Sequence, residues 1–378
     1  MGKNDHFVPR HYLRQFCFEE TEQIVVATVD PFKLIGLGGI SGQCQADYFY
    51  EKDLKLDEIH KDFETQIAPI LVEVCRAMSF SGDDMIALRL LAIELHGRTR
   101  KAAEAYKVLP RHLGSEIVKD GIARGKLREP KGGWKDEMMG IGGASGALMG
   151  MTTLKFFEMQ TLHCKMLLAK GGTSFVTSDN PVVVMNQFCA NPDDHRSFAG
   201  FGMAGFQLVL PISPSLCLIF YDPNVYKIGN RREALVEISE HDVEIVNALQ
   251  VQSADKCLYS HSLESKTQLS RLVTRYARLR TPVHDSLIII PGSNEKQTFL
   301  HTRMPSAKLP IPWAFCRYRK HVTSRPGDLR NPARSETIQR LVKDIKEDQN
   351  GGDVFERLRR IISDGPSHQA DVAFPRKD

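Results

Sequence analysis

The chain has 378 residues, of which 42% are hydrophobic and 25% charged, a composition that indicates a globular protein with a sizeable core and excludes a disordered or fibrous chain. The formal net charge of +4 does not by itself indicate nucleic-acid binding. No apolar run reaches the roughly 18 residues of a membrane-spanning helix, so no membrane segment is expected.

The N-terminus and the cysteines bear on location and on metal binding. The first residues lack the apolar stretch of a signal peptide, so we expect a cytoplasmic protein. The eight cysteines are scattered, and none lies within four residues of another. This spacing excludes zinc knuckles and thioredoxin-type motifs and favours buried free thiols.

The first elements are a short helix, a strand and a loop. Pro9 suits the first position of a helix that ends near Phe16, and His6 then lies just before the helix start. Residues 23–29 are rich in β-branched side chains and predict a strand. The glycine-rich residues 34–42 predict a loop.

Two long helices are expected next. Apolar residues repeat with helical spacing over 56–78, where Pro69 should kink or split the helix. The second helix should run from residue 81 to about residue 106 and be buried, because its middle is apolar almost all round. Residues 98–135 are basic, with eleven lysines and arginines against four acidic residues.

A mostly antiparallel sheet is predicted for the second half of the body. Strands are expected within 174–185, 206–221 and 286–291, and helices over 151–168, 240–254 and 269–279. We therefore expect one α+β core domain over residues 1–300, with the N-terminal helices packed on the sheet. Residues 301–378 hold sixteen basic and ten acidic residues and predict a basic appendage with two short helices, over 335–346 and 354–362.

Several polar residues are candidates for chemistry, and each also has a structural interpretation. His6 can act as a general acid or base near neutral pH, or it can bond the helix start. Glu94 lies on the most apolar helix and can pair with Arg98 at i,i+4. Alternatively, Arg98 and Arg100 can form a fork for a phosphate or carboxylate.

Asp179 and Glu64 are further carboxylate candidates. Asp179 follows a strand, where catalytic and metal-binding carboxylates are common, but the Ser-Asp-Asn-Pro sequence also suits an Asx-turn. Glu64 lies beside the apolar stripe of its helix and, on local evidence, is solvated. The glycine loops at 36–39 and 140–143 match no phosphate-binding motif.

Several segments together resemble one protein family. Residues 6–16 resemble the opening motif His-x-Val-Pro-x-x-Tyr-Leu-x-x-Phe of a bacterial family known only as domain of unknown function four-two-three-eight. Residues 95–100 resemble its arginine-bearing helix end, and residues 175–182 its Ser-Asp-Asn-Pro turn. The resemblance covers roughly residues 4–262, but residues 107–150 have no clear counterpart.

The resemblance implies a function without naming a mechanism. Members are similar to single-gene systems of bacterial and phage-satellite defence loci, which favours a toxic effector. We expect nuclease-like phosphodiester hydrolysis, with RNA or DNA contacted by the basic segments 98–135 and 301–378. An alternative is a non-catalytic sensor that captures an anionic ligand or a phage protein, and a third is that the motif residues hold the fold.

Roles follow for the polar motif residues. A Mg²⁺ or Mn²⁺ ion is expected because hard cations prefer oxygen ligands, with Glu64 and Asp179 as its ligands. The expected substrate-binding residues are Arg10, Arg98, Arg100 and Asn180. The expected catalytic residues are His6, Glu64, Glu94 and Asp179.

Overall fold

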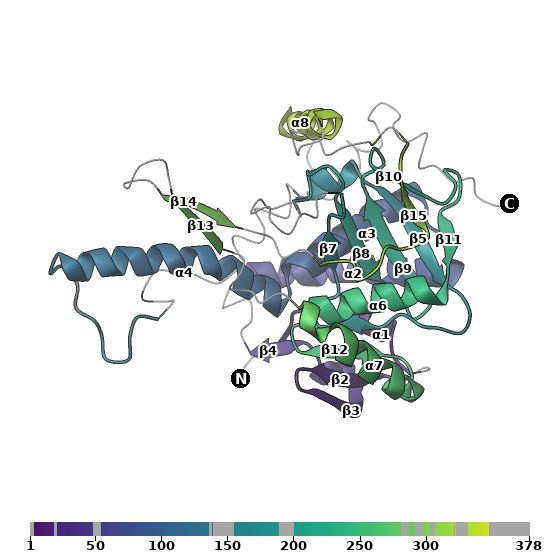
Figure 1. The fold of residues 1–378 in the computed structure, drawn as a ribbon, viewed down its shortest axis with the longest axis horizontal. Helices are drawn as coiled ribbons and strands as arrows, with labels where there is room; N and C mark the ends of the chain where they lie inside the picture. The colour runs from purple at the N-terminus through teal and green to yellow at the C-terminus, as the bar shows by residue number, and fades with distance from the viewer. Residues whose placement is uncertain are drawn as a thin grey trace.

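The structure is a computed structural model and describes residues 4–18, 21–47, 54–135, 138, 155–188, 200–280, 287–291, 298–302, 307–320, 322 and 332–347. The fold is α+β, with helices packed against mostly antiparallel sheets (Figure 1), as the sequence predicts. No helix among these residues is both long enough and apolar enough to cross a membrane.

The N-terminal helix and strand form near their expected positions, although the helix begins after Pro9 and ends two residues before Phe16. Strand β1 (Asn4–His6) leads into helix α1 (Arg10–Arg14), and Pro9 takes the N-cap position with φ −61° and ψ 142°. Strand β1 pairs with β4 (Gln45–Asp47). Strand β2 covers Gln23–Val29, the residues expected for it. His6 therefore ends a strand immediately before the α1 start.

The predicted glycine loop at 34–42 is instead strand β3 (Phe32–Gly39) followed by the 3-10 turn η1 (Ile40–Gly42). Strand β3 is an edge strand of the sheet, and none of its residues is fully buried. Its pairing with β2 shifts register between Val26 and Ala27, opposite Gly36, whose φ is +102°. Glycine thus serves here as the β-bulge residue of a strand.

Three long helices follow. Helix α2 (Leu54–Ala77) runs through Pro69 as one element, so Pro69 does not split it. The helix predicted over 81–106 is two helices, α3 (Gly82–Gly97) and α4 (Arg100–Ala123). The Thr99 hydroxyl accepts a hydrogen bond from the Ala102 amide and caps the new helix. The middle of α3 is buried, as expected.

A five-stranded sheet forms the centre of the molecule, in the order β11-β5-β9-β8-β7. Its strands are β5 (His163–Ala169), β7 (Val183–Met185), β8 (Gln207–Pro211), β9 (Leu216–Tyr221) and β11 (Leu235–Ile238). Only β11 pairs in parallel, with β5. The helix prediction over 151–168 is wrong in its second half: residues 155–160 are helical, but the residues from His163 on form β5. Strand β5 is a buried inner strand, and a short run of apolar residues fits a buried strand and a buried helix equally well.

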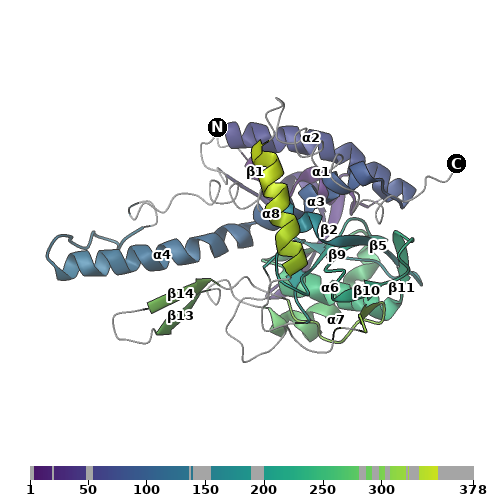
Figure 2. The same ribbon diagram turned by 90° about the horizontal axis from the view of Figure 1, so that it is seen from above.

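The faces of this sheet pack on different helices (Figure 2). Leu208, Leu218 and Phe220 share a core with residues of α1, α2 and α3. The alternate residues Val209 and Ile219 share a second core with α6 (Glu240–Ser253). The period-2 alternation of strand side chains therefore builds a three-layer body.

A four-stranded sheet in the order β3-β2-β12-β6 completes the body. It adds β6 (Thr177–Ser178) and β12 (Cys257–Ser260), and a third core joins it to α6 and α7. Helix α7 covers Lys266–Tyr276, between the 3-10 turns η3 (Leu263–Ser265) and η4 (Ala277–Leu279). These helices match the ranges expected from the sequence.

The described residues beyond 300 partly pack on the body. Trp313 is buried in the second core, and β15 (Cys316–Tyr318) pairs with β10 (Tyr226–Ile228). Helix α8 (Pro332–Glu347) is the first predicted tail helix, and its Arg334 is 2% exposed. Strands β13 (Leu287–Pro291) and β14 (Thr298–Thr302) pair with each other. The helix predicted over 354–362 lies outside the described residues.

Candidate functional site

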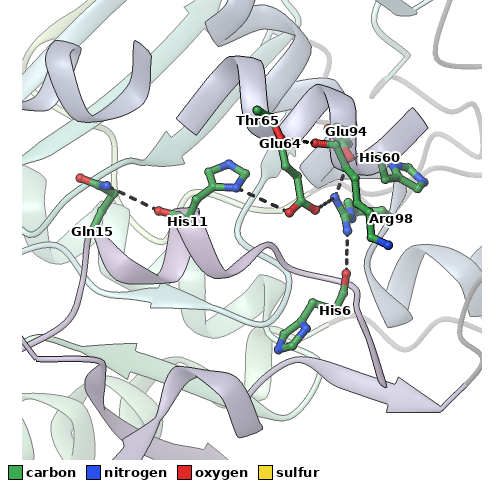
Figure 3. A network of polar contacts seen from close by, with 9 residues as sticks. His6, His11, Gln15, His60, Glu64, Thr65, Glu94 and Arg98 are labelled. Atoms are coloured by element: carbon green, nitrogen blue, oxygen red, sulfur yellow. Dashed lines mark hydrogen bonds and ion pairs between the residues drawn. The ribbon is translucent and has the colours of Figure 1, made fainter. Parts of the chain in front are cut away.

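A buried arginine holds two glutamates where α2 and α3 meet (Figure 3). Arg98, at the C-cap of α3, is 3% exposed and donates from Nη1 to Glu64 Oε1 at 2.8 Å and to Glu94 Oε1 at 2.6 Å. The i,i+4 pair of Glu94 and Arg98 expected from the sequence is thereby confirmed. Glu64 is 31% exposed, so this carboxylate is partly solvated, as local pattern suggests, and it also pairs with the buried Arg98.

His6 is tied to the same arginine through its main chain. Arg98 Nη2 donates to the His6 carbonyl at 2.6 Å, and His6 Nε2 lies 3.2 Å from the Ser41 carbonyl oxygen. Burial lowers the pKa of the half-buried His6 imidazole, which outweighs the hydrogen bond to Ser41. The imidazole is therefore mostly neutral at pH 7, the form that can accept a proton.

Two further histidines border the cluster, and the sequence analysis did not select either. His60 Nδ1 lies 2.8 Å from Glu94 Oε1. His11 Nδ1 lies 3.9 Å from Glu64 Oε2, burial lowers the pKa of its imidazole, and its buried Nε2 has no partner. The i,i+4 spacing of His60 and Glu64 is the sequence signal that could have found one of them, since such residues share a helix face.

Asp179 belongs to a different hydrogen-bonded group. Its carboxylate accepts three backbone N–H bonds, from Asp255 at 2.8 Å, Lys256 at 2.8 Å and Cys257 at 3.0 Å. Burial raises the pKa of Asp179 to about 6, although these amide bonds favour the charged form. Asp179 thus accepts hydrogen bonds from the main chain of residues 255–257, whereas in an Asx-turn its side chain would accept one from its own turn.

Asn180 and Arg100 lie beside Asp179. The Thr99 hydroxyl donates to Asn180 Oδ1 at 2.6 Å, and Asn180 Nδ2 donates to the Ser253 carbonyl at 3.1 Å and hydroxyl at 2.8 Å. Arg100, half exposed, has its Nε 4.0 Å from Asp255 Oδ2. The Arg98–Thr99 junction between α3 and α4 therefore joins the His6 group to the Asp179 group.

Arg10 is the expected phosphate-binding arginine that lies closest in sequence to His6. Its side chain is 43% exposed and donates from Nη2 to Glu22 Oε2 at 2.9 Å. Its charge lowers the pKa of His6 further, after the effect of burial. Of the expected substrate-binding residues, Arg10 and Arg100 are accessible and Arg98 is not.

The two expected metal ligands are engaged by other groups. Glu64 pairs with Arg98, and both carboxylate oxygens of Asp179 are held by main-chain amides. Across the part of the chain that the structure describes, no group of three or more His, Cys, Asp or Glu is arranged to hold a metal. The Mg²⁺ or Mn²⁺ prediction stays untested.

The family described as "Protein of unknown function (DUF4238)" matches residues 4–106 and 147–264. The chain belongs to this family. No curated protein and no solved structure matches the chain. The DUF4238 match contains His6, Glu64, Glu94, Arg98 and Asp179 and omits residues 107–146, which include the outer part of α4.

Proposed function

We propose that the chain hydrolyses phosphodiester bonds of nucleic acid, with His6 as the proton-transfer residue. The observation that carries the proposal is the half-buried, neutral imidazole whose main chain is held by a buried arginine between two glutamates. A catalytic imidazole needs a fixed position, which the hydrogen bonds to Arg98 and Ser41 supply, and burial lowers its pKa and so favours the neutral form that accepts a proton.

The residues divide into reacting and positioning groups. His6 takes a proton from the attacking water as its oxygen bonds to phosphorus, and returns it to the leaving ribose oxygen as the old bond to phosphorus breaks. Arg10 and Arg100, which are accessible, neutralise the phosphate. Arg98, Glu64 and Glu94 act through His6 as positioning residues, and Asp179 holds the main chain at 255–257.

The test is cleavage of labelled RNA and DNA by the purified chain, with magnesium, with manganese and with a chelator. We expect cleavage by the unmodified chain and its loss in His6→Ala. The matched control is His261→Ala, because His261 is also half-buried with a pKa lowered by burial. Cleavage retained in His6→Ala, or absent from the unmodified chain under every condition, contradicts the proposal.

The proposed setting is a toxic effector of anti-phage defence that acts in the cytoplasm. It rests on the likeness of members of the family that the motifs resemble to single-gene systems of bacterial and phage-satellite defence loci. Cells that carry the chain should reduce phage plaque numbers, and cells that carry His6→Ala should not. If cells with the unmodified chain and cells with His6→Ala were protected equally, the defence function would not depend on hydrolysis at His6.

One observation favours the second candidate, a non-catalytic sensor. The Glu64, Glu94, Arg98 and Asp179 side chains already bond one another or the main chain, as expected of groups that position their neighbours and take no part in a reaction. Protection that needs His6 but proceeds without turnover of any nucleic acid would support the sensor over the hydrolase.

A further inference from the structure

Helix α4 forms an arm that leaves the body (Figures 1 and 2). Its first turns are anchored, since Lys101 Nζ donates to the Gln252 and Ser253 carbonyls and the Tyr106 hydroxyl accepts from Lys155 at 2.7 Å. The family match stops at residue 106 and resumes at 147. The outer part of the arm is therefore an addition to the family core.

The basic residues along the outer part of α4 are paired within the helix. Lys107 and Arg111 share Glu104, and Lys119 pairs with Glu116. Arg124 Nε lies 2.8 Å from Asp120. This stretch of helix therefore presents little unbalanced positive charge.

The end of α4 is built to reverse the chain. Gly125 has φ +68°, its amide donates to the Ile122 carbonyl at 2.9 Å, and the Lys126 amide donates to the Gly121 carbonyl at 2.8 Å. These two bonds make a Schellman motif. Leu127 packs so tightly on Gly121 that a Cβ there would lie 2.5 Å from Leu127 Cδ1. The segment that follows thus has a fixed start.

The residues after this turn, 126–135, form what we call the basic tip. Within the basic tip, Lys126, Arg128, Lys131 and Lys135 are exposed, and none forms an ion pair with a described residue. Its one acidic residue is Glu129. The basic tip therefore carries three of the seven surplus positive charges of segment 98–135, within ten residues at the outer end of the arm.

An indole lies among these cations. Trp134 is partly buried, and its Nε1 has no hydrogen-bond acceptor among the residues that the structure describes. Cations that contact phosphates, together with an aromatic ring on which a base stacks, are the usual components of a single-strand binding surface. Leu127, the other large apolar residue of the tip, packs back on α4, which leaves little to insert into a membrane.

We propose that the basic tip binds single-stranded nucleic acid, with its four exposed cations on the phosphates and Trp134 stacked on a base. This inference rests on the proposed function for the class of ligand, but binding at the tip does not require cleavage at His6. The tip would deliver substrate to a family core that lacks such an arm.

The test measures binding of a fluorescently labelled single-stranded oligonucleotide by anisotropy, in a His6→Ala background with chelator, so that nothing is cut. The tip variant carries Lys126→Gln, Arg128→Gln, Lys131→Gln and Lys135→Gln. The matched control changes the four paired cations of the helix to glutamine, which alters the net charge equally: Lys107, Arg111, Lys119 and Arg124. Circular dichroism verifies that both variants remain helical.

We expect the tip variant to lose about tenfold or more in affinity, and its salt-dependence slope to fall by about 3, since each single-strand phosphate contact adds about 0.7. Trp134→Leu should weaken binding without changing the slope. The control variant should stay within about twofold. An equal loss in both variants, no loss in the tip variant, or tip-dependent binding to anionic vesicles in place of oligonucleotide overturns the proposal.

The same experiment separates this inference from the proposed function. Tip-dependent binding in a chain that never cleaves nucleic acid supports the tip and refutes the hydrolase. Cleavage that depends on His6 but is indifferent to the tip variant, at any salt concentration, refutes the tip and leaves the hydrolase standing.

Discussion

Replacing Arg98 with methionine removes the cation between Glu64 and Glu94 and keeps much of the side-chain volume. Arg98 is 3% exposed, Glu94 10% and Glu64 31%, so Glu94 loses its charge partner in a nearly dry site while Glu64 is partly screened by water. Removing one partner of a buried ion pair costs about 3–5 kcal/mol. Because Glu64 is partly solvated and His60 can still bond Glu94, we expect the lower value, about 3 kcal/mol.

The assay is urea unfolding, read as the change in midpoint at constant slope. Adding Glu94→Gln to Arg98→Met removes the unpaired carboxylate and should restore about 1–2 kcal/mol. The surface control is Arg76→Met, whose pair with Glu73 is 74% and 59% exposed and should contribute little to stability, because water screens it. If Arg98→Met lowered the free energy of unfolding as little as Arg76→Met, the proposed stabilising role of the buried Arg98 between Glu64 and Glu94 would be refuted.

Three further predictions concern stability. Burial raises the pKa of Asp179 from its ordinary value of 3.8 to about 6 in the folded protein, so the stability that this group contributes is full below pH 3.8 and is lost as the pH rises through 6. In Asp179→Asn, the free energy of unfolding measured with urea should therefore change less with pH over this range. Arg334→Ala should lower stability by about 3 kcal/mol and speed proteolysis of α8, whereas Arg340→Ala on its exposed face should do neither. Tyr12→Phe should lower the free energy of unfolding by about 1–2 kcal/mol, and with it the thermal midpoint, because the buried hydroxyl lies 2.7 Å from the Thr177 hydroxyl oxygen. An unchanged midpoint would contradict a stabilising role for this hydrogen bond.

Local chemistry made much of the fold predictable. Pro9 at the α1 start and the β-branched run of β2 act through neighbours in the chain, and both elements formed where expected. The errors at β3 and β5 have a different origin. Strand pairing at the sheet edge turned a glycine-rich segment into a strand, and burial between β9 and β11 made a strand of an apolar run that also suits a helix.

The site was predictable only in part, for the same reason. The pairing of Glu94 with Arg98 follows from helical spacing. The approach of Glu64 and of the His6 carbonyl to Arg98 depends on how α1, α2 and α3 pack, which no local pattern encodes. Asp179 satisfies main-chain amides more than seventy residues away, and this long-range contact decides between its two sequence interpretations.

The pH dependence of the single-turnover cleavage rate tests the central claim most directly. If His6 transfers the proton, the rate should rise with pH through a pKa below the ordinary histidine value of 6.5 and then level off, because burial lowers the pKa of this imidazole. Arg98→Met should shift that pKa, and His6→Ala should abolish the rise. A profile that is unchanged in His6→Ala would contradict the account.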